Sequence, residues 1–301
     1  MDSDTLLQCP QGELRLKRMS QRSCLQFFKA AFAATALSSI FALCAEAQYA
    51  VEVVSYDEGT TPAPLFNQEM SAIGSPERFT GEGTNFASAV TPFNSPFLTD
   101  EIVSVGEGGQ LTLRLSNFVI PQSAGPEIGV FTNSAIFDMD FPNGLAGDPV
   151  VQFSVDQALV EVSMDGSSWV SLGDTTFDGI TNGYNDLAQT QPSDFQQPFA
   201  NPISDFAGLN YSDGSGNDIL SVLNGSGGGT WLDISSTGLS QVGFVRFSVA
   251  DDNDDMTGFN FELDAVSIAS SAVGPVTPEP SAGFLLVMAS LIVGCSIRRR
   301  R

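Results

Sequence analysis

The chain has 301 residues, of which 35 are acidic, 12 are basic and none is histidine, so its net charge at pH 7 is −23. A surface this acidic repels nucleic acid and anionic lipid and attracts cations. Without histidine the chain has no Ser-His-Asp or Cys-His nucleophile and no imidazole zinc site. A carboxylate pair, as in glycoside hydrolysis, remains chemically available, but the sequence singles out no pair. We therefore expect a protein that is not an enzyme and does not bind nucleic acid.

The first 47 residues predict a cleaved signal peptide. A basic stretch precedes an apolar run over residues 30–44, which is expected to be helical, and Ala45-Glu46-Ala47 then provides an A-x-A cleavage pattern. Signal peptidase would leave Gln48 as the first mature residue. The basic stretch is long when counted from Met1, whereas a start at Met19 gives an ordinary signal peptide, so we predict Met19 as the true start.

The segment from residue 48 to residue 280 differs sharply in composition from the two ends. It contains 31 acidic residues and three arginines, a net charge of −28, and it has no lysine and no cysteine. The compartment beyond a secretory membrane would permit disulfides, but this segment can form none. Its stability must therefore come from its core, with bound metal as a further possible source.

Alternation of apolar and polar residues predicts strands through this segment. The clearest runs cover residues 110–120, 150–155, 159–164, 241–249 and 259–268, with further strands at 52–55 and 129–137 and a weaker one at 219–223. Long amphipathic helices are absent from the sequence pattern. We predict an all-β fold, an antiparallel β-sandwich or jelly roll, forming one domain over residues 48–272.

Turns and loops separate these runs. Asp165-Gly166 is expected to be a hairpin turn, in which Gly166 takes a positive φ and Asp165 accepts hydrogen bonds from its own turn. A long loop is expected over residues 174–217, the glycine-rich stretch 225–229 reads as a loop, and residues 270–277 read as a linker.

A dense acidic run lies between the last two predicted strands. Hard oxygen ligands grouped on one loop suit calcium, and no basic residue stands nearby. The candidate calcium ligands are Asp251, Asp252, Asp254, Asp255 and Asp264. The spacing does not match an EF-hand loop, and a plain solvated turn is the alternative interpretation.

The two tryptophans, Trp169 and Trp231, are the candidate carbohydrate-binding residues. An aromatic face can pack on the apolar face of a pyranose. The alternative is that both are core or rim side chains, because aromatic residues commonly dominate protein cores.

Residues 273–301 form the last predicted region, a linker followed by a tail. Pro278-Glu279-Pro280 precedes an uncharged apolar segment over residues 282–297, and Arg298, Arg299, Arg300 and Arg301 follow. As a helix of 16 residues the apolar segment spans ~24 Å, a little short of a ~30 Å hydrocarbon core. The arginines should stay cytoplasmic, which leaves the acidic domain outside. The apolar segment is therefore expected to be a transmembrane helix.

This tail resembles a PEP-CTERM sorting signal, which consists of Pro-Glu-Pro, one hydrophobic segment and an arginine cluster. The resemblance implies that an exosortase recognises Pro278, Glu279 and Pro280 and removes the tail in a Gram-negative-type bacterium that makes an exopolysaccharide. Thr277 stands where the family usually has Val. A permanent C-terminal anchor is the alternative.

The body also resembles secreted PEP-CTERM β-proteins. Residues 73–76, 90–94, 102–109, 130–133, 160–166 and 263–266 carry that likeness, and the 160–169 stretch is similar to hairpins of discoidin-like and carbohydrate-binding jelly rolls. These resemblances imply an exported, non-enzymatic protein of the cell surface or extracellular matrix, held transiently in the inner membrane and associated with extracellular polysaccharide. A carbohydrate-binding module and a carboxylate glycoside hydrolase are the alternatives.

Overall fold

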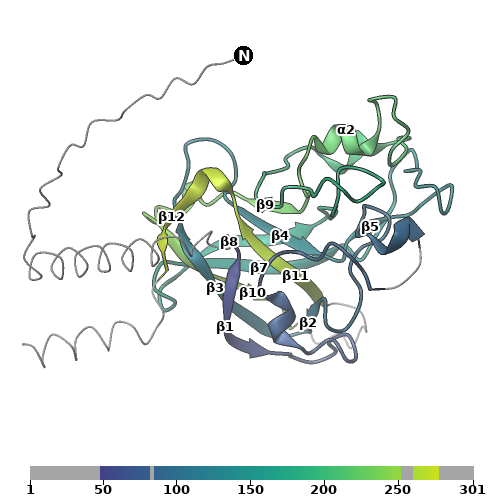
Figure 1. The fold of residues 1–301 in the computed structure, drawn as a ribbon. Coiled ribbons are helices and arrows are strands. Elements are labelled where there is room, and N and C mark those ends of the chain that lie inside the picture. The colour runs from purple at the N-terminus through teal and green to yellow at the C-terminus, as the bar shows by residue number, and fades with distance from the viewer. Residues whose placement is uncertain (1–47, 82–84, 252–259, 278–301) are drawn as a thin grey trace, which may run out of the picture. The chain divides into compact units, whose positions relative to one another are not determined.

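The computed structural model describes residues 48–81, 85–251 and 260–277, and these residues form a mostly β domain with antiparallel sheets (Figure 1). The strands are β1 (Ala50–Asp57), β2 (Val103–Val105), β3 (Gln110–Val119), β4 (Ile128–Thr132), β5 (Ala135–Ile136), β6 (Gln152–Phe153), β7 (Asp156–Ser163), β8 (Trp169–Phe177), β9 (Thr230–Leu232), β10 (Val242–Ser248), β11 (Phe261–Ile268) and β12 (Val273–Val276). One α-helix, α2 (Ile219–Leu223), is described, with short 3₁₀ turns at Glu69–Ala72, Asn85–Ser88, Ile203–Phe206, Ser235–Thr237 and Ser270–Ala272.

The larger sheet has the strand order β1-β3-β10-β7-β8, and β12 also pairs with β3. Along β3 the side chains alternate between the two faces of the sheet. Leu111, Leu113 and Leu115 point into the core, while Thr112 and Arg114 lie on the opposite face. The five clearest predicted strands are all present, although the one expected over 150–155 is only the two-residue β6.

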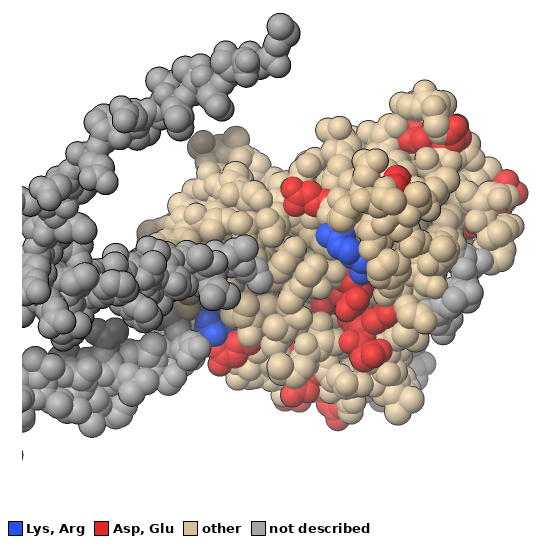
Figure 2. All heavy atoms as spheres, in the orientation of Figure 1, with Lys and Arg blue, Asp and Glu red and all other residues tan. Residues whose placement is uncertain are grey.

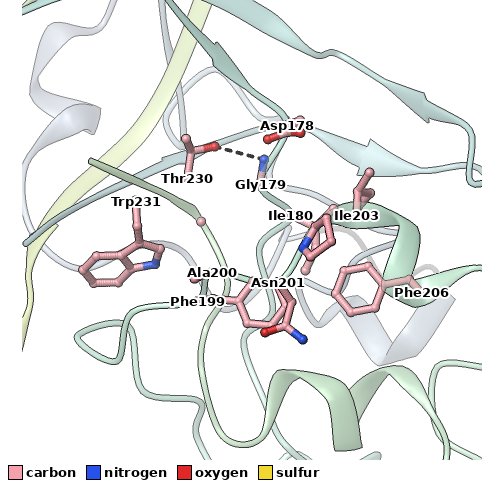
Figure 3. Close-up of a pocket in the computed structure, with 12 residues that line it drawn as sticks. Asp178, Gly179, Ile180, Phe199, Ala200, Asn201, Ile203, Phe206, Thr230 and Trp231 are labelled. Carbon is pink, nitrogen blue, oxygen red and sulfur yellow. Dashed lines mark hydrogen bonds between the residues drawn. The ribbon is translucent and has the colours of Figure 1, made fainter. Parts of the chain in front are cut away.

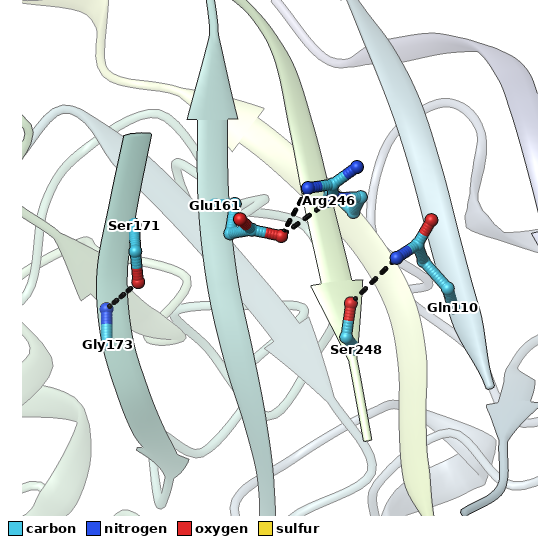
Figure 4. Close-up of polar contacts among 6 residues, drawn as sticks. All are labelled: Gln110, Glu161, Ser171, Gly173, Arg246 and Ser248. Atoms are coloured by element: carbon cyan, nitrogen blue, oxygen red, sulfur yellow. Dashed lines mark hydrogen bonds and ion pairs between the residues drawn. The ribbon is translucent and has the colours of Figure 1, made fainter. Parts of the chain in front are cut away.

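The outer face of the larger sheet carries polar pairs between neighbouring strands (Figure 4). The side chain of Glu161 on β7 accepts a 2.8 Å hydrogen bond from Arg246 Nε on β10, and Gln110 on β3 donates to Ser248 Oγ at 3.1 Å. Cross-strand pairs of this kind stabilise neighbouring strands and allow one face of an antiparallel sheet to meet water.

The smaller sheet has the order β2-β11-β4-β9 and shares a core with the larger one. Rings from both sheets meet there. The Phe177 and Phe261 centroids are 4.8 Å apart, those of Phe247 and Phe261 are 4.9 Å apart, and all three side chains are fully buried. The arrangement is β-sandwich-like, in agreement with the predicted all-β class.

The chain between β8 and β9 folds back over the outer face of the smaller sheet. Ser267 Oγ on β11 donates a 2.7 Å hydrogen bond to the Phe195 carbonyl, and the Phe195 ring packs edge-on against Phe131 of β4. This segment has a small core of its own, which includes Phe206 and Ile219 and which it shares with residues near β5. In Figure 1 it forms the part of the domain around α2.

Four expectations need correction. The loop expected over 174–217 begins within β8, which continues to Phe177, and it contains the 3₁₀ turn Ile203–Phe206. The strand expected at Ile219–Leu223 is wrong, because this segment is α2: the Asp218 side chain accepts a hydrogen bond from Ser221 N at its start, and Asn224 ends it in the left-handed region. The strand expected over 129–137 is divided into β4 and β5. The expected 270–277 linker contains β12, and the Thr277 carbonyl accepts a 3.1 Å hydrogen bond from Arg114.

The predicted signal peptide and the predicted transmembrane segment both lie outside the described residues. Within 48–81, 85–251 and 260–277, no helix has the length and apolar character needed to cross a membrane.

Candidate functional site

One of the two predicted carbohydrate-binding tryptophans lines a pocket. The pocket has a volume of about 260 Å³ and lies where β8 ends, between the segment that folds back and β9. Figure 3 shows the Trp231 indole on one side and Phe206 on the other, with Asn201 and Phe199 between them. Thr230 Oγ1 accepts a 3.0 Å hydrogen bond from Gly179 N, which fixes the rim.

The chain holds the Trp231 indole in one orientation. Its Nε1 donates a 2.8 Å hydrogen bond to the Gly228 carbonyl, and its ring meets Phe131 edge-on at 6.4 Å. Gly129, its partner across β4 and β9, leaves the space that the ring occupies, because a Cβ there would stand 2.9 Å from Trp231 Cζ2. The half-buried ring is thus partly a packing side chain and partly a pocket wall.

The pocket combines aromatic walls with polar groups at its rim. Trp231 and Phe199 supply apolar surface, while the exposed Asp178 and Asn201 supply a carboxylate and an amide. Concave apolar surface with a few polar groups that fix orientation is the usual character of a small-molecule site. The volume is below the ~300–1,000 Å³ typical of sites that enclose drug-sized ligands, so this pocket suits the insertion of a single ring.

Trp169 lies elsewhere and is already covered on one face. It begins β8, whereas Asp178 and Gly179 of the Trp231 pocket follow the end of β8, which puts roughly 25–30 Å of strand between the two places. The Arg246 guanidinium lies 4.1 Å from the centroid of the Trp169 ring, and Arg246 also forms an ion pair with Glu161. The structure does not bring the two tryptophans together.

Of the five candidate calcium ligands, Asp252, Asp254 and Asp255 lie outside the described residues. The exposed Asp251 lines an open depression together with Asp57 and Glu107. Among the described residues, no group of three or more acidic, histidine or cysteine side chains is arranged to hold a metal ion.

Asp264, the fifth candidate, is fully buried on β11 and lies among other neighbours. Its carboxyl oxygens accept hydrogen bonds of 3.1 and 3.3 Å from Glu77 N. Burial raises the pKa of Asp264 well above its ordinary value, and the Glu77 and Glu101 carboxylates add to that shift. Asp251 thus lies in an open depression and Asp264 is buried beside Glu77, so these two predicted ligands have different neighbours.

The structure also singles out a carboxylate pair that the sequence does not, Asp156 and Glu262. Asp156 Oδ2 accepts a 2.9 Å hydrogen bond from Glu262 N, and neither residue lines the pocket of Trp231. The two residues are 106 positions apart, so no local pattern could have joined them. In the sequence pattern, Asp156 lies between the strands predicted over 150–155 and 159–164, and Glu262 lies within the strand predicted over 259–268, so neither residue stands out.

The sorting motif (Pro278, Glu279, Pro280 and the four terminal arginines) and the cleavage residues Ala45 and Ala47 lie outside the described residues, and Gln48 is the first residue within them. No protein-family model matches this chain, and the comparison with curated proteins likewise gives no match.

Proposed function

We propose that this is an exported, non-enzymatic protein of the cell envelope or extracellular matrix, delivered through its C-terminal tail. The observation that carries the proposal is the order of three features in that tail: Pro278-Glu279-Pro280, the uncharged segment 282–297 and the arginines 298–301. Signal peptidase acts before Gln48, and an exosortase acts at the tail. Between the two cleavages the chain is anchored in the inner membrane with its acidic domain outside.

The chemistry of the domain supports such a destination. On the face shown in Figure 2, acidic groups occur at many places, while basic atoms occupy only small areas. The segment that carries the domain has no lysine and no cysteine. A strongly negative surface keeps an exported protein soluble and away from anionic lipid, and it concentrates cations around the protein.

Mass spectrometry of the protein from its native host tests the processing. We expect peptides that begin at Gln48 and no peptides from residues 282–301. A chain in which Pro278, Glu279 and Pro280 are all changed to alanine should keep its tail and accumulate in the membrane fraction. Intact tail peptides in the final product of the unchanged protein would refute exosortase processing and favour a permanent anchor.

The domain itself is proposed to be a jelly roll. Its strands pair in a nested order, β2 with β11, β3 with β10, β4 with β9 and β7 with β8. Two antiparallel sheets of four strands that alternate in this way match the double Greek key of that fold, with β1 and β12 added beside β3. This order supports the assignment more directly than the turn motifs of the sequence.

Carbohydrate binding is a second candidate function, favoured by the pocket of Trp231. An aromatic wall with the Asn201 amide and the Asp178 carboxylate at its rim would pack on a sugar ring and hydrogen-bond its hydroxyls. The ligand would be a neutral polysaccharide, because the surface repels acidic ones.

Affinity gel electrophoresis on neutral polysaccharides tests this second candidate. We expect retardation of the unchanged protein and weaker retardation of Asn201→Ala, whose exposed side chain contributes nothing to the core. Trp169→Ala is the matched control and should bind as the unchanged protein does. Equal loss in both variants, or no retardation on any polysaccharide, would remove this candidate while leaving the proposed sorting untouched.

A further inference from the structure

Three strands from both sheets bring a group of oxygen-bearing side chains together. Asp156 is the first residue of β7, Glu262 is the second residue of β11, and Asn133 directly follows β4. β11 pairs with β4 within one sheet, and the hydrogen bond from Glu262 N to Asp156 connects that sheet to the other one. We call Asp156, Glu262 and Asn133 the carboxylate–amide cluster.

The contacts inside this cluster leave oxygen atoms available. Asn133 Nδ2 donates a hydrogen bond to Glu262 Oε2, and Asn260 Nδ2 donates to Glu262 Oε1 at 2.9 Å. A carboxylate oxygen has two lone pairs, so each of these atoms can accept a further interaction. Asn260 also donates to Ser104 Oγ at 3.0 Å, which holds its amide in place beside Glu262.

One oxygen of the cluster is buried without a partner. Asn133 is only 7% exposed, and within the described part of the chain its Oδ1 receives no hydrogen bond. A buried carbonyl oxygen that lacks a partner has lost its hydration without gaining a hydrogen bond, so it favours any ligand that can supply a positive charge or a donor. The amide that carries this oxygen contacts Glu262 through its nitrogen, so the unpartnered atom lies close to the Glu262 carboxylate.

Within the part of the chain that the structure describes, no basic side chain compensates the two carboxylates. Residues 48–280 contain three basic side chains. Each of them has its partners elsewhere: Arg78 donates to the Gly183 and Ser193 carbonyls, Arg114 pairs with Glu52, and Arg246 pairs with Glu161. The charge of this half-buried carboxylate pair is then balanced by protons, by water or by a cation from solution.

Burial acts on both carboxyl groups in the same direction. Burial raises the pKa of Asp156 to about 7. The negative charge of the Glu262 carboxylate adds to this shift, whereas the hydrogen bond from Glu262 N opposes it. Burial also raises the pKa of Glu262. A bound cation would reverse both shifts, since a neighbouring positive charge favours the ionised form.

We propose that the carboxylate–amide cluster binds a divalent cation that prefers oxygen ligands, with Ca²⁺ as its natural occupant. Asp156 and Glu262 supply carboxylate oxygens, Asn133 supplies its Oδ1, and water completes the six to eight ligands that Ca²⁺ takes. Mg²⁺ demands a tighter octahedron and dehydrates reluctantly, so it should bind more weakly. With two carboxylates the affinity should fall near the ~10⁻⁴–10⁻³ M range of extracellular calcium modules.

Calorimetric titration of the full-length chain in detergent, stripped with EDTA and then titrated with CaCl₂ or MgCl₂, tests the site. We expect Ca²⁺ to bind and to raise the Tm of the unchanged protein. Asp156→Asn should weaken Ca²⁺ binding by roughly tenfold or more, because it removes a charged ligand and keeps the size of the side chain. In EDTA its Tm should equal or exceed that of the unchanged protein, since one half-buried carboxylate without a basic partner is gone.

Asn133→Asp is the matched gain-of-function variant. It adds a third carboxylate at the position of the amide, so it should tighten Ca²⁺ binding and lower the Tm measured in EDTA. A purely structural role for Asn133 would not produce a tighter Ca²⁺ affinity.

Two control variants distinguish Ca²⁺ binding at this cluster from binding at other acidic residues. Asp174→Asn changes an exposed carboxylate on β8, and Asp251→Asn changes the first residue of the acidic run. Both should bind Ca²⁺ as the unchanged protein does. Unaltered Ca²⁺ binding in Asp156→Asn, loss of binding in Asp251→Asn alone, or no Ca²⁺ binding by the unchanged protein would each overturn the proposal.

Discussion

Tyr56, near the end of β1, shows how a single side chain can couple stability to pH. Its hydroxyl donates a 2.7 Å hydrogen bond to the Ser104 carbonyl. Burial raises the Tyr56 pKa to about 12, and the carboxylates of Glu58, Glu69 and Asp57 add to the shift. The unfolded chain would release this proton near pH ~10, so the neutral phenol stabilises the fold below that pH.

We predict that the free energy of unfolding falls between pH 10 and pH 12. In this range the unfolded state has lost the Tyr56 proton that the folded state still holds, so raising the pH favours unfolding. Tyr56→Phe should make the decline shallower, as measured by urea unfolding at several pH values. Burial also raises the pKa of Tyr211, so some slope should remain and should disappear in the double variant with Tyr211→Phe. A slope that is unchanged in Tyr56→Phe would contradict the assignment.

Turn chemistry is also a matter of single residues, and there the sequence predicted the structure well. Gly166 has a φ of +74°, and Asp165 Oδ1 accepts hydrogen bonds of 2.8 and 2.9 Å from Ser167 N and Ser168 N. These contacts confirm the predicted hairpin turn. The turn could be predicted from the sequence because all its interactions lie within three residues. The carboxylate–amide cluster joins residues that are more than 100 positions apart, and it could emerge only from the pairing of whole strands.

At the scale of elements, alternation predicted most of the long strands and failed on short segments. The nine-residue β8 is the exception among the long strands, because its last four residues were expected to belong to the 174–217 loop. β3, β7, β10 and β11 each have seven or more residues, and all four were predicted. Ile219–Leu223 has five apolar or small residues, which fit a strand or one helical turn equally well by periodicity. Its helical state depends on Asp218 and Asn224, which cap the two ends.

We predict that Asp218→Ala destabilises the domain by about 1 kcal/mol, the usual cost of losing an N-cap. Asp218 Oδ1 accepts hydrogen bonds from Ser221 N at 2.9 Å and from Ser221 Oγ, so alanine leaves both donors without this acceptor. Asp218→Asn keeps the acceptor and should cost less. Urea unfolding of both variants gives the comparison, and equal losses would mean that charge rather than capping is responsible.

At the scale of the whole molecule, stability depends on one core shared by two sheets. Phe177 of β8 and Phe247 of β10 meet Phe261 of β11, and all three side chains have no exposed surface. No disulfide can support this core, because the cysteines Cys9, Cys24, Cys44 and Cys295 all lie outside residues 48–277.

We predict that Phe177→Ala costs about 3–5 kcal/mol of unfolding free energy, the range for removing a large buried aromatic side chain. Phe153→Ala is a suitable control, because Phe153 on β6 is 38% exposed and should cost much less. Denaturant unfolding gives both values. A small loss for Phe177→Ala would show that the two sheets do not depend on each other for stability.

The nested pairing of the strands also has a consequence for the timing of folding. Phe261 pairs with Val105, 156 positions earlier in the chain, so the smaller sheet cannot be completed until nearly the whole domain is present. Contacts so distant in sequence make folding slow, because a long loop must close before its contacts can form. Under the proposed export route, translocation proceeds from the N-terminus, so the chain remains unfolded and able to thread until β11 emerges. The topology itself would delay folding during passage, and the anchored tail would then keep the slowly folding chain at the membrane surface.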